Sequence, residues 1–393
     1  MRLSTEPSGT IWTIRLAIVN SIGFGATTIM PLWIAAMPSA LGMPAWQIGL
    51  VATAQLVACG LFNVASPWLL GRMAPLAVAR NALLIATLAC LGQALALALE
   101  GPPALPFFAA SALVSGAALG VLLGMTNRIM AGGDHVQKGY AVFQIVEVCF
   151  ASALYLAGAA LLGQFGPRAI FFLASGIGAA GLAVLYRLAG PQATGRSDAA
   201  PLGQPPPLRL HGIMLLLAML CFFSGQSSIN SFVIPIGRDI GLDAASVSHI
   251  VGAGMILALI GAAMARMMGE RLGVAAPIAL VALLLAADFL FLTRSPLPWG
   301  FAIGVGLIPL GTILAVPFFF TALARVDAGG RFAAVGPAFL LGGVALGPLI
   351  ATALDGTIGR PALGIAAALL TALGGAVVLL FRQRNLAPIP IDQ

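Results

Sequence analysis

The sequence predicts an all-α integral membrane protein with twelve transmembrane helices arranged in two six-helix halves. The chain is 60% hydrophobic and 8% charged, whereas a soluble domain carries about 25% charged residues. Its apolar residues gather in twelve stretches of about 20 residues or more, the length that crosses a bilayer. Its positive charges fall almost entirely in every second gap between those stretches, a pattern typical of a polytopic protein with one orientation.

The expected helices follow the apolar stretches in order. They cover residues 11–37, 46–70, 78–99, 106–130, 139–163, 168–188, 211–236, 246–268, 275–293, 299–324, 333–354 and 361–381. Between the sixth and seventh helices, residues 190–207 read GPQATGRSDAAPLGQPPP, a Pro/Gly-rich composition typical of a flexible linker. We therefore expect a first bundle over 1–189, a linker over 190–210 and a second bundle over 211–393.

The charge pattern predicts the orientation. One side of the membrane carries fifteen positive residues: Arg2, Arg15, Arg72, Arg80, Arg128, Lys138, Arg187, Arg196, Arg209, Arg266, Arg271, Arg325, Arg331, Arg382 and Arg384. The other side carries only Arg168, Arg238, Arg294 and Arg360. Because the richer side is cytoplasmic, both termini and the linker are expected in the cytoplasm, with the protein in the inner (plasma) membrane. The net charge of +7 comes from single residues at helix ends, which argues against a nucleic-acid partner.

Several other classes are excluded or disfavoured by the sequence. Cys59, Cys90, Cys149 and Cys221 lie inside apolar stretches without zinc-site spacing, so we expect packing roles. The first apolar run is too long for a signal-peptide core. No G-x-x-x-x-G-K-[ST] motif is present, so ATP drive would need a separate subunit. We expect no cofactor and no enzymatic activity, because no acid–base or metal-ligand cluster is evident.

The two halves are related to each other in sequence. Residues Gly42 to Ala45 match Gly241 to Ala244 with an offset of 199. Phe165-Gly166-Pro167-Arg168 before the sixth helix is similar to Ile358-Gly359-Arg360-Pro361 before the twelfth. These matches occur in chain order and on the same side of the membrane, so they indicate a duplicated six-helix unit.

With this repeat, the whole chain resembles the major facilitator superfamily of secondary transporters, in which two six-helix halves surround a central site. The family carries a G-x-x-x-D-R-x-G-R-R motif after the second helix of each half. Residues Gly269 to Gly273 fit it with Glu270 for the usual Asp, whereas residues Gly71 to Ala74 keep only the arginine. The resemblance implies a cytoplasmic gate formed by Arg72, Glu270 and Arg271; the alternative is that Glu270 and Arg271 are ordinary interfacial charges.

Glu147 is the residue most indicative of function. Counted from Gly139, it lies about 12 Å inside the fifth helix at 1.5 Å per residue. A carboxyl at that depth should be paired, hydrated or protonated, and it could couple transport to protons. Gln144 shares its helix face. The alternative is a structural acid satisfied by Asn127 or Arg128.

Two further charged residues have competing explanations. Arg128 could bind a substrate carboxylate or extend to the lipid head groups. For Asp288 in the ninth helix we expect a pair with Arg294 or an interfacial position, not a coupling role.

Uncharged polar residues follow one another in the first helix of each half. In the family these helices line the central cavity. The first presents Asn20, Phe24 and Thr27, and the seventh presents Phe223, Gln226 and Asn230. These are candidate substrate-binding residues, although interhelical packing explains such residues equally well.

The preferred interpretation is a monomeric, proton-coupled secondary transporter of a small, partly apolar organic compound, such as an aromatic or a monoanion. Its partners are the substrate, protons and membrane lipids. Multidrug or metabolite efflux by proton antiport is the first alternative, although the fifth helix lacks the Gly-Pro-x-x-Gly-Gly motif that marks proton-driven exporters in the family. A receptor or lipid scramblase on the same fold is a second alternative, and it predicts indifference to a proton gradient.

Overall fold

The computed structural model describes residues 17–23, 25–70, 73, 75–99, 103–131, 136–187, 210–268, 273–294, 297–326 and 331–385. All regular secondary structure in this part of the chain is helical. The helices are α2 (Gly25–Thr28), α3 (Met30–Leu41), α4 (Ala45–Leu70), α5 (Pro75–Ala96), α6 (Ala104–Ala131), α7 (Val136–Phe165), α8 (Arg168–Arg187), α9 (Leu210–Asp239), α10 (Ala244–Met268), α11 (Ala275–Leu292), α12 (Pro298–Val326), α13 (Arg331–Thr357) and α14 (Arg360–Asn385).

These helices correspond in order to the predicted ones. Eleven of those in the described residues are long and apolar enough to cross a membrane. The predicted first helix is divided instead. Residues 17–23 and α2 are helical, a turn follows at Ile29, and α3 begins at Met30. Pro31 lies in the first turn of α3 and has no N–H to donate to the carbonyl of Thr27, which weakens the helix at that point.

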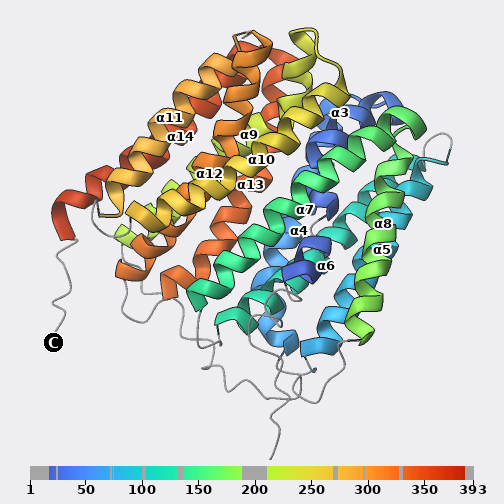
Figure 1. Cartoon of the computed structure of the whole chain (residues 1–393), viewed down its shortest axis with the longest axis horizontal. Coiled ribbons are helices and arrows are strands. Elements are labelled where there is room, and N and C mark those ends of the chain that lie inside the picture. The colour runs from blue at the N-terminus through green and yellow to red at the C-terminus, as the bar shows by residue number, and fades with distance from the viewer. Residues whose placement is uncertain are drawn as a thin grey trace, which may run out of the picture.

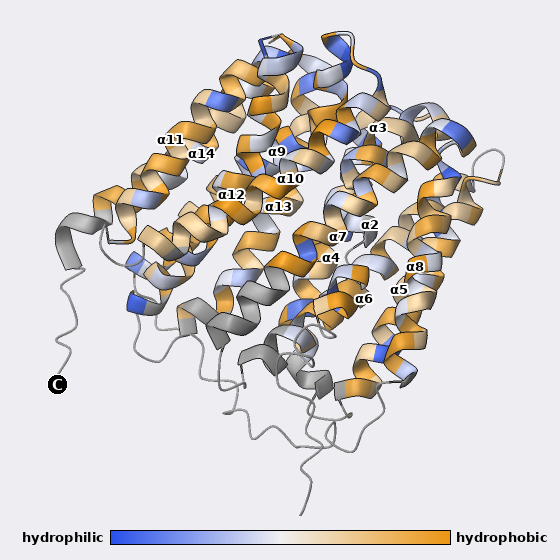
Figure 2. Cartoon of the chain, in the orientation of Figure 1, coloured by the Kyte–Doolittle hydropathy of each residue, from blue (hydrophilic) through white to orange (hydrophobic). Residues whose placement is uncertain are grey.

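The helices form two groups that lie side by side. α2–α8 make up one group and α9–α14 the other, with α7 and α10 running together between them (Figure 1). Hydrophobic residues predominate along the helices, and hydrophilic ones gather mainly at their ends (Figure 2). The division into residues 1–189, 190–210 and 211–393 stays a prediction, since nearly all of the linker lies outside the described residues.

The turns confirm that the two groups are built alike. Gly42 and Gly241 both have a positive φ, of 64° and 85°. The following residue in each turn donates to the carbonyl five residues earlier, Met43 to Pro38 and Leu242 to Gly237. This left-handed glycine cap is a common way to end a helix, and it recurs here at the offset of 199. Gly166 and Gly359, with φ of 75° and 98°, form a second matched pair.

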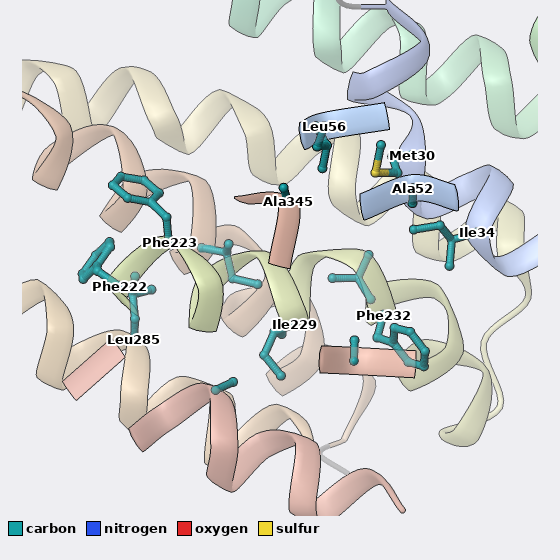
Figure 3. Close-up of a cluster of buried hydrophobic side chains, with 14 of the residues drawn as sticks. Met30, Ile34, Ala52, Leu56, Phe222, Phe223, Ile229, Phe232, Leu285 and Ala345 are labelled. Atoms are coloured by element: carbon teal, nitrogen blue, oxygen red, sulfur yellow. The ribbon is translucent and has the colours of Figure 1, made fainter. Parts of the chain in front are cut away.

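We call the end of the molecule that carries the α3–α4 and α9–α10 turns the outer end, following the predicted orientation. Near it the halves are in tight contact, because Gly49 of α4 approaches Thr352 and the Pro348 carbonyl of α13. Buried apolar side chains continue this contact: Met30, Ile34, Ala52 and Leu56 of the first half belong to one cluster with Ile229, Phe232 and Ala345 of the second (Figure 3).

Farther along, α4 still lies against α13, since a Cβ on Gly60 would lie 3.7 Å from Leu341, but an exposed side chain follows. Gln55 and Phe62 are seven residues apart and therefore lie on nearly the same face of the helix. Gln55 is 0% exposed, whereas Phe62 is 45% exposed. In the described residues, the halves thus meet closely near the outer end, and Phe62 toward the inner end of α4 is exposed.

Candidate functional site

Glu147 lies inside α7, farther from the start of the helix than the sequence predicted. The helix begins at Val136, three residues earlier than expected, so Glu147 is about 16 Å from its start at 1.5 Å per residue. The residue is partly buried. It makes no hydrogen bond or ion pair with any residue in the part of the chain that the structure describes. The alternative partners Asn127 and Arg128 have side chains outside the described part of the structure, so that alternative is not tested. An acid in a membrane span without a counter-ion would be protonated or hydrated.

Contacts between α7 and the first membrane helix show which residues of that helix lie at the same height as Glu147. A Cβ placed on Gly25 would lie 3.4 Å from Leu154, and one on Gly158 would lie 3.1 Å from Leu32. Both segments start from the inner end, so they run parallel with an offset of about 127 residues. Glu147 is therefore level with Asn20, about one helical turn inward of Gly25.

Two unpartnered polar groups lie at this level. Asn20 and Ser21 are each 1% exposed, and within the described residues neither Asn20 Oδ1 nor Ser21 Oγ has a hydrogen-bond partner. Ser21 precedes Gly25 by four residues, the spacing of one helix face, and Gly25 lies against Leu154 of α7. Asn20 was predicted as a site residue, but Ser21 was missed. The sequence signal was available, because a serine one turn before a glycine in a membrane helix is typical of a helix contact.

The remaining predicted residues of the first helix lie nearby. Thr27 is partly buried in α2. Its backbone carbonyl receives no bond from position 31, which is proline. Phe24 lies outside the described residues.

The polar residues of α9 divide between two faces of that helix. Ser227 donates to the Val344 carbonyl of α13 at 2.8 Å, so it serves helix packing. Gln226 is 8% exposed, Asn230 is partly buried, and neither hydrogen bonds with the described residues. With Phe223 they repeat at three and four residues, which places all three on one face.

Phe223 itself is part of the core of the second half. It is 1% exposed, and its ring centroid lies 5.2 Å from that of Phe222 and 6.1 Å from that of Phe319. Phe223 is therefore a packing residue that helps to fix the position of α9, which carries Gln226 and Asn230.

Of the two positions predicted for Asp288, the pair with Arg294 is not formed in the described structure, and the interfacial position stays a prediction. Asp288 is 6% exposed and makes no ion pair with Arg294 in the described structure. Its carboxylate faces Gly304 of α12, and Oδ2 accepts no hydrogen bond. Arg294 follows six residues later, roughly 240° around a helix, which explains why the two do not meet.

Other predicted residues fall outside this description. The gate residues Arg72, Glu270 and Arg271 lie outside the described residues. Arg128 and Gln144 belong to α6 and α7, but their side chains are outside the described part of the structure. All four cysteines are free, and Cys149 is exposed instead of packed. Among the described residues, no group of three or more His, Cys, Asp or Glu could hold a metal ion.

A duplicated bundle of membrane-spanning helices, with an embedded carboxyl and unpartnered amides beside the contact between its halves, is the architecture of a secondary transporter. The sequence profile of the Major Facilitator Superfamily matches residues 16–336, and the chain belongs to that family. None of the curated protein sequences matches the chain.

Solved structures show the same fold. A bacterial homologue of the human lysosomal transporter Spinster, in an inward-facing and occupied conformation, aligns with a TM-score of 0.76 at 14% identity over 98% of this chain and 100% of that one. A D-xylose–proton symporter gives 0.75 at 13% over 95% and 97%. The human organic anion transporter MFSD10 gives 0.66 at 17% over 95% and 100%. At these identities the likeness establishes the fold alone.

Proposed function

We propose that this chain is a proton-coupled secondary transporter that moves a small, partly apolar organic compound across the inner membrane by alternating access. The observation that carries this proposal is Glu147, a membrane-embedded carboxyl with no partner in the described structure, level with the unpartnered groups of Asn20 and Ser21. An acid in this setting can gain a proton on one side of the membrane and lose it on the other.

The substrate class follows from the polar groups that remain available. Asn20, Gln226 and Asn230 offer hydrogen bonds without formal charge, and Phe24 and Thr27 follow Asn20 closely in the sequence. Together with Arg128 and Gln144, this set suits an aromatic compound or a monoanion. Polyanions need several basic residues. The solved relatives include symporters and transporters of sugars, nucleosides and organic anions.

The gate and orientation complete the proposal. Arg72, Glu270 and Arg271 would hold the inner end shut in the outward-facing state. Closure of the outer end between Gly49 and Thr352 would correspond to the inward-facing state. Both termini would be cytoplasmic, and one copy of the chain would suffice.

The test begins with a ligand. A thermal-shift screen of the purified protein against a metabolite panel identifies compounds that raise apparent stability. Uptake of the best compound is then measured in proteoliposomes with and without a pH gradient. We expect gradient-driven accumulation by the native protein, and its reduction to the level of empty liposomes in Glu147→Gln, with the thermal shift retained.

Asp288→Asn is the matched control, because it removes the other buried carboxyl while leaving the first half intact. It should accumulate the compound as the native protein does. Gradient-driven accumulation by Glu147→Gln at every pH would overturn the coupling role of Glu147. Indifference of the native protein to the gradient would favour the receptor or scramblase alternative. The same liposomes give the direction of transport, since an exporter drives the compound the other way.

A further inference from the structure

A cavity of about 210 Å³ lies at the outer end of the second half, away from the proposed transport pathway. It forms where α9 ends, α11 ends and α14 begins, and its lining consists of Ile236, Asp239, Ile240, Leu292, Thr293, Arg294, Arg360 and Pro361. Asp239 is the last residue of α9 and Arg360 the first of α14. The charged part of the cavity therefore lies where the apolar spans stop, at the depth of the lipid head groups.

Arg360 organises the cavity. Its Nε donates to Asp355 Oδ1 at 2.6 Å, and its Nη1 lies 3.1 Å from Asp239 Oδ2. The second contact has the distance of an ion pair but not the angle of a hydrogen bond, since Nη1 has no hydrogen-bond partner. The guanidinium also lies 5.7 Å from the ring centre of Phe232. Two carboxylates and an aromatic ring thus hold Arg360 in place.

One positive and one negative group remain available in the same cavity. Arg294 is exposed and makes no ion pair within the described residues. The Asp239 side chain is 50% exposed, so its carboxylate is accessible beside its contact with Arg360. A ligand that fits this pair carries an anion and a cation a short distance apart.

The protein surface below the cavity is apolar and faces outward. α11 and α14 lie against each other at the edge of the molecule (Figure 1). Phe291 on α11 and Ile365 and Leu369 on α14 are 48%, 44% and 66% exposed. These side chains form a wall along which acyl chains can lie.

We propose that this cavity binds the head group of a phospholipid that carries a primary ammonium, the phosphoethanolamine class. The phosphate pairs with Arg294, the ammonium pairs with Asp239, and the acyl chains follow the α11–α14 surface. At about 30 Å³ per water molecule, the cavity corresponds to about seven waters, which is room for a phosphate with a two-carbon amine. An anionic head group without an amine would leave Asp239 beside a negative charge and is disfavoured.

The test is a lipid titration of the purified full-length protein, followed by native mass spectrometry. Phosphatidylethanolamine, phosphatidylcholine and phosphatidylglycerol with identical acyl chains are compared. We expect retention of phosphatidylethanolamine at about tenfold lower lipid concentration than the other two, the equivalent of one charge-assisted hydrogen bond. The trimethylammonium of phosphatidylcholine cannot donate that bond.

Variants assign the effect to the cavity. Arg294→Gln should weaken retention of phosphatidylethanolamine about tenfold. Asp239→Asn should remove the discrimination between phosphatidylethanolamine and phosphatidylcholine. Arg238→Gln changes an exposed neighbour outside the cavity and should behave as the native protein, and gel filtration checks that every variant is folded.

Three results would overturn the proposal. These are equal retention of the three lipids, unchanged discrimination in both Arg294→Gln and Asp239→Asn, and full competition by glycerophosphoethanolamine, which lacks acyl chains. The last result would identify a site for a soluble zwitterion. None of these measurements depends on transport, so they are independent of the proposed function.

Discussion

In the first half, Gln55 and Gln93 are fully buried, and neither end of either side-chain amide makes a hydrogen bond. In the second half, three buried serines of α9 donate to backbone carbonyls: Ser224, Ser227 and Ser228, the last to Ser224 at 2.7 Å. Of the sixteen buried side-chain polar atoms without a partner in the described residues, thirteen belong to the first half. An unsatisfied buried group costs about 1–3 kcal/mol. Among the described residues, the second half thus satisfies its buried polar side chains more completely than the first half does.

The apolar packing of the two halves does not differ in this way. Each half contains a trio of aromatic rings in edge or tilted contact, Trp33, Phe108 and Phe171 in the first and Phe222, Phe223 and Phe319 in the second. Because both halves contain such a trio, the number of unpartnered buried polar atoms is the difference to be tested. Substitutions made in matched pairs, one in each half, can test it.

The largest expected effect tests the equivalence of the packing. Gly120 of α6 lies against the Cys59 carbonyl of α4, and Gly261 of α10 lies against the Leu310 carbonyl of α12. A larger side chain at either position must separate two helix backbones, so Gly120→Leu and Gly261→Leu should each destabilise by about 3 kcal/mol or more. Fluorescence-detected gel filtration should show loss of the monodisperse peak in both variants.

Gly163→Leu on α7 is the control, because a Cβ there would meet nothing within 4 Å. It should leave the peak unchanged. If only one of the two interfacial variants loses the folded protein, the halves are not packed equally and the comparison needs revision.

A smaller effect of opposite sign tests the polar difference. Gln55→Leu replaces an unpartnered amide and should raise stability by about 1 kcal/mol. Ser227→Ala removes the bond to Val344 and should lower stability by about 1 kcal/mol. Thermal unfolding of the purified variants measures both. A loss of stability in Gln55→Leu would contradict the difference, because it would mean that the amide is already satisfied.

Most of the fold could be predicted from the sequence. Twelve apolar stretches and matching segments in the two halves specify the helices, and the matched turns at Gly42 and Gly241 follow from similar local sequence. The interruption at Ile29 could have been anticipated from Pro31, yet hydropathy alone gives one continuous helix. Local patterns carry this information because membrane helices form from contiguous segments.

The site could be predicted only in part. Glu147 is recognisable because any acid in an apolar stretch is unusual. The neighbours of such a residue depend on helix rotation and offset, which sequence periodicity does not fix. For this reason Ser21 was not singled out. Asp288 faces Gly304, so the pair with Arg294, one of the two positions predicted for it, is not formed in the described structure. The cavity around Arg360 joins three helix ends far apart in the chain, so no local pattern indicates it.

The smallest expected effect concerns a turn that differs between the halves. Asp243 begins the α10 turn, and its Oδ1 accepts a hydrogen bond from the Ser246 backbone N–H at 3.0 Å. Pro44 occupies the matching place before α4. The hydrogen bonds from Ser246 hold the pKa of Asp243 below its ordinary value of 3.8. A carboxyl with a lowered pKa stabilises the folded state above the unfolded pKa, and this contribution is lost as the pH falls through the folded pKa.

Asp243→Asn removes the negative charge but keeps a side chain that can cap the helix, because asparagine also caps helices and does not titrate. We expect the unfolding temperature of the native protein to fall slightly more than that of Asp243→Asn as the pH is lowered from 7 to below about 4. Asp243→Ala should be less stable than both at neutral pH. If the unfolding temperatures of the native protein and Asp243→Asn fall in parallel with pH, the charge of Asp243 adds no stability. In that case the Asp243 turn would not differ in pH dependence from the Pro44 turn of the first half.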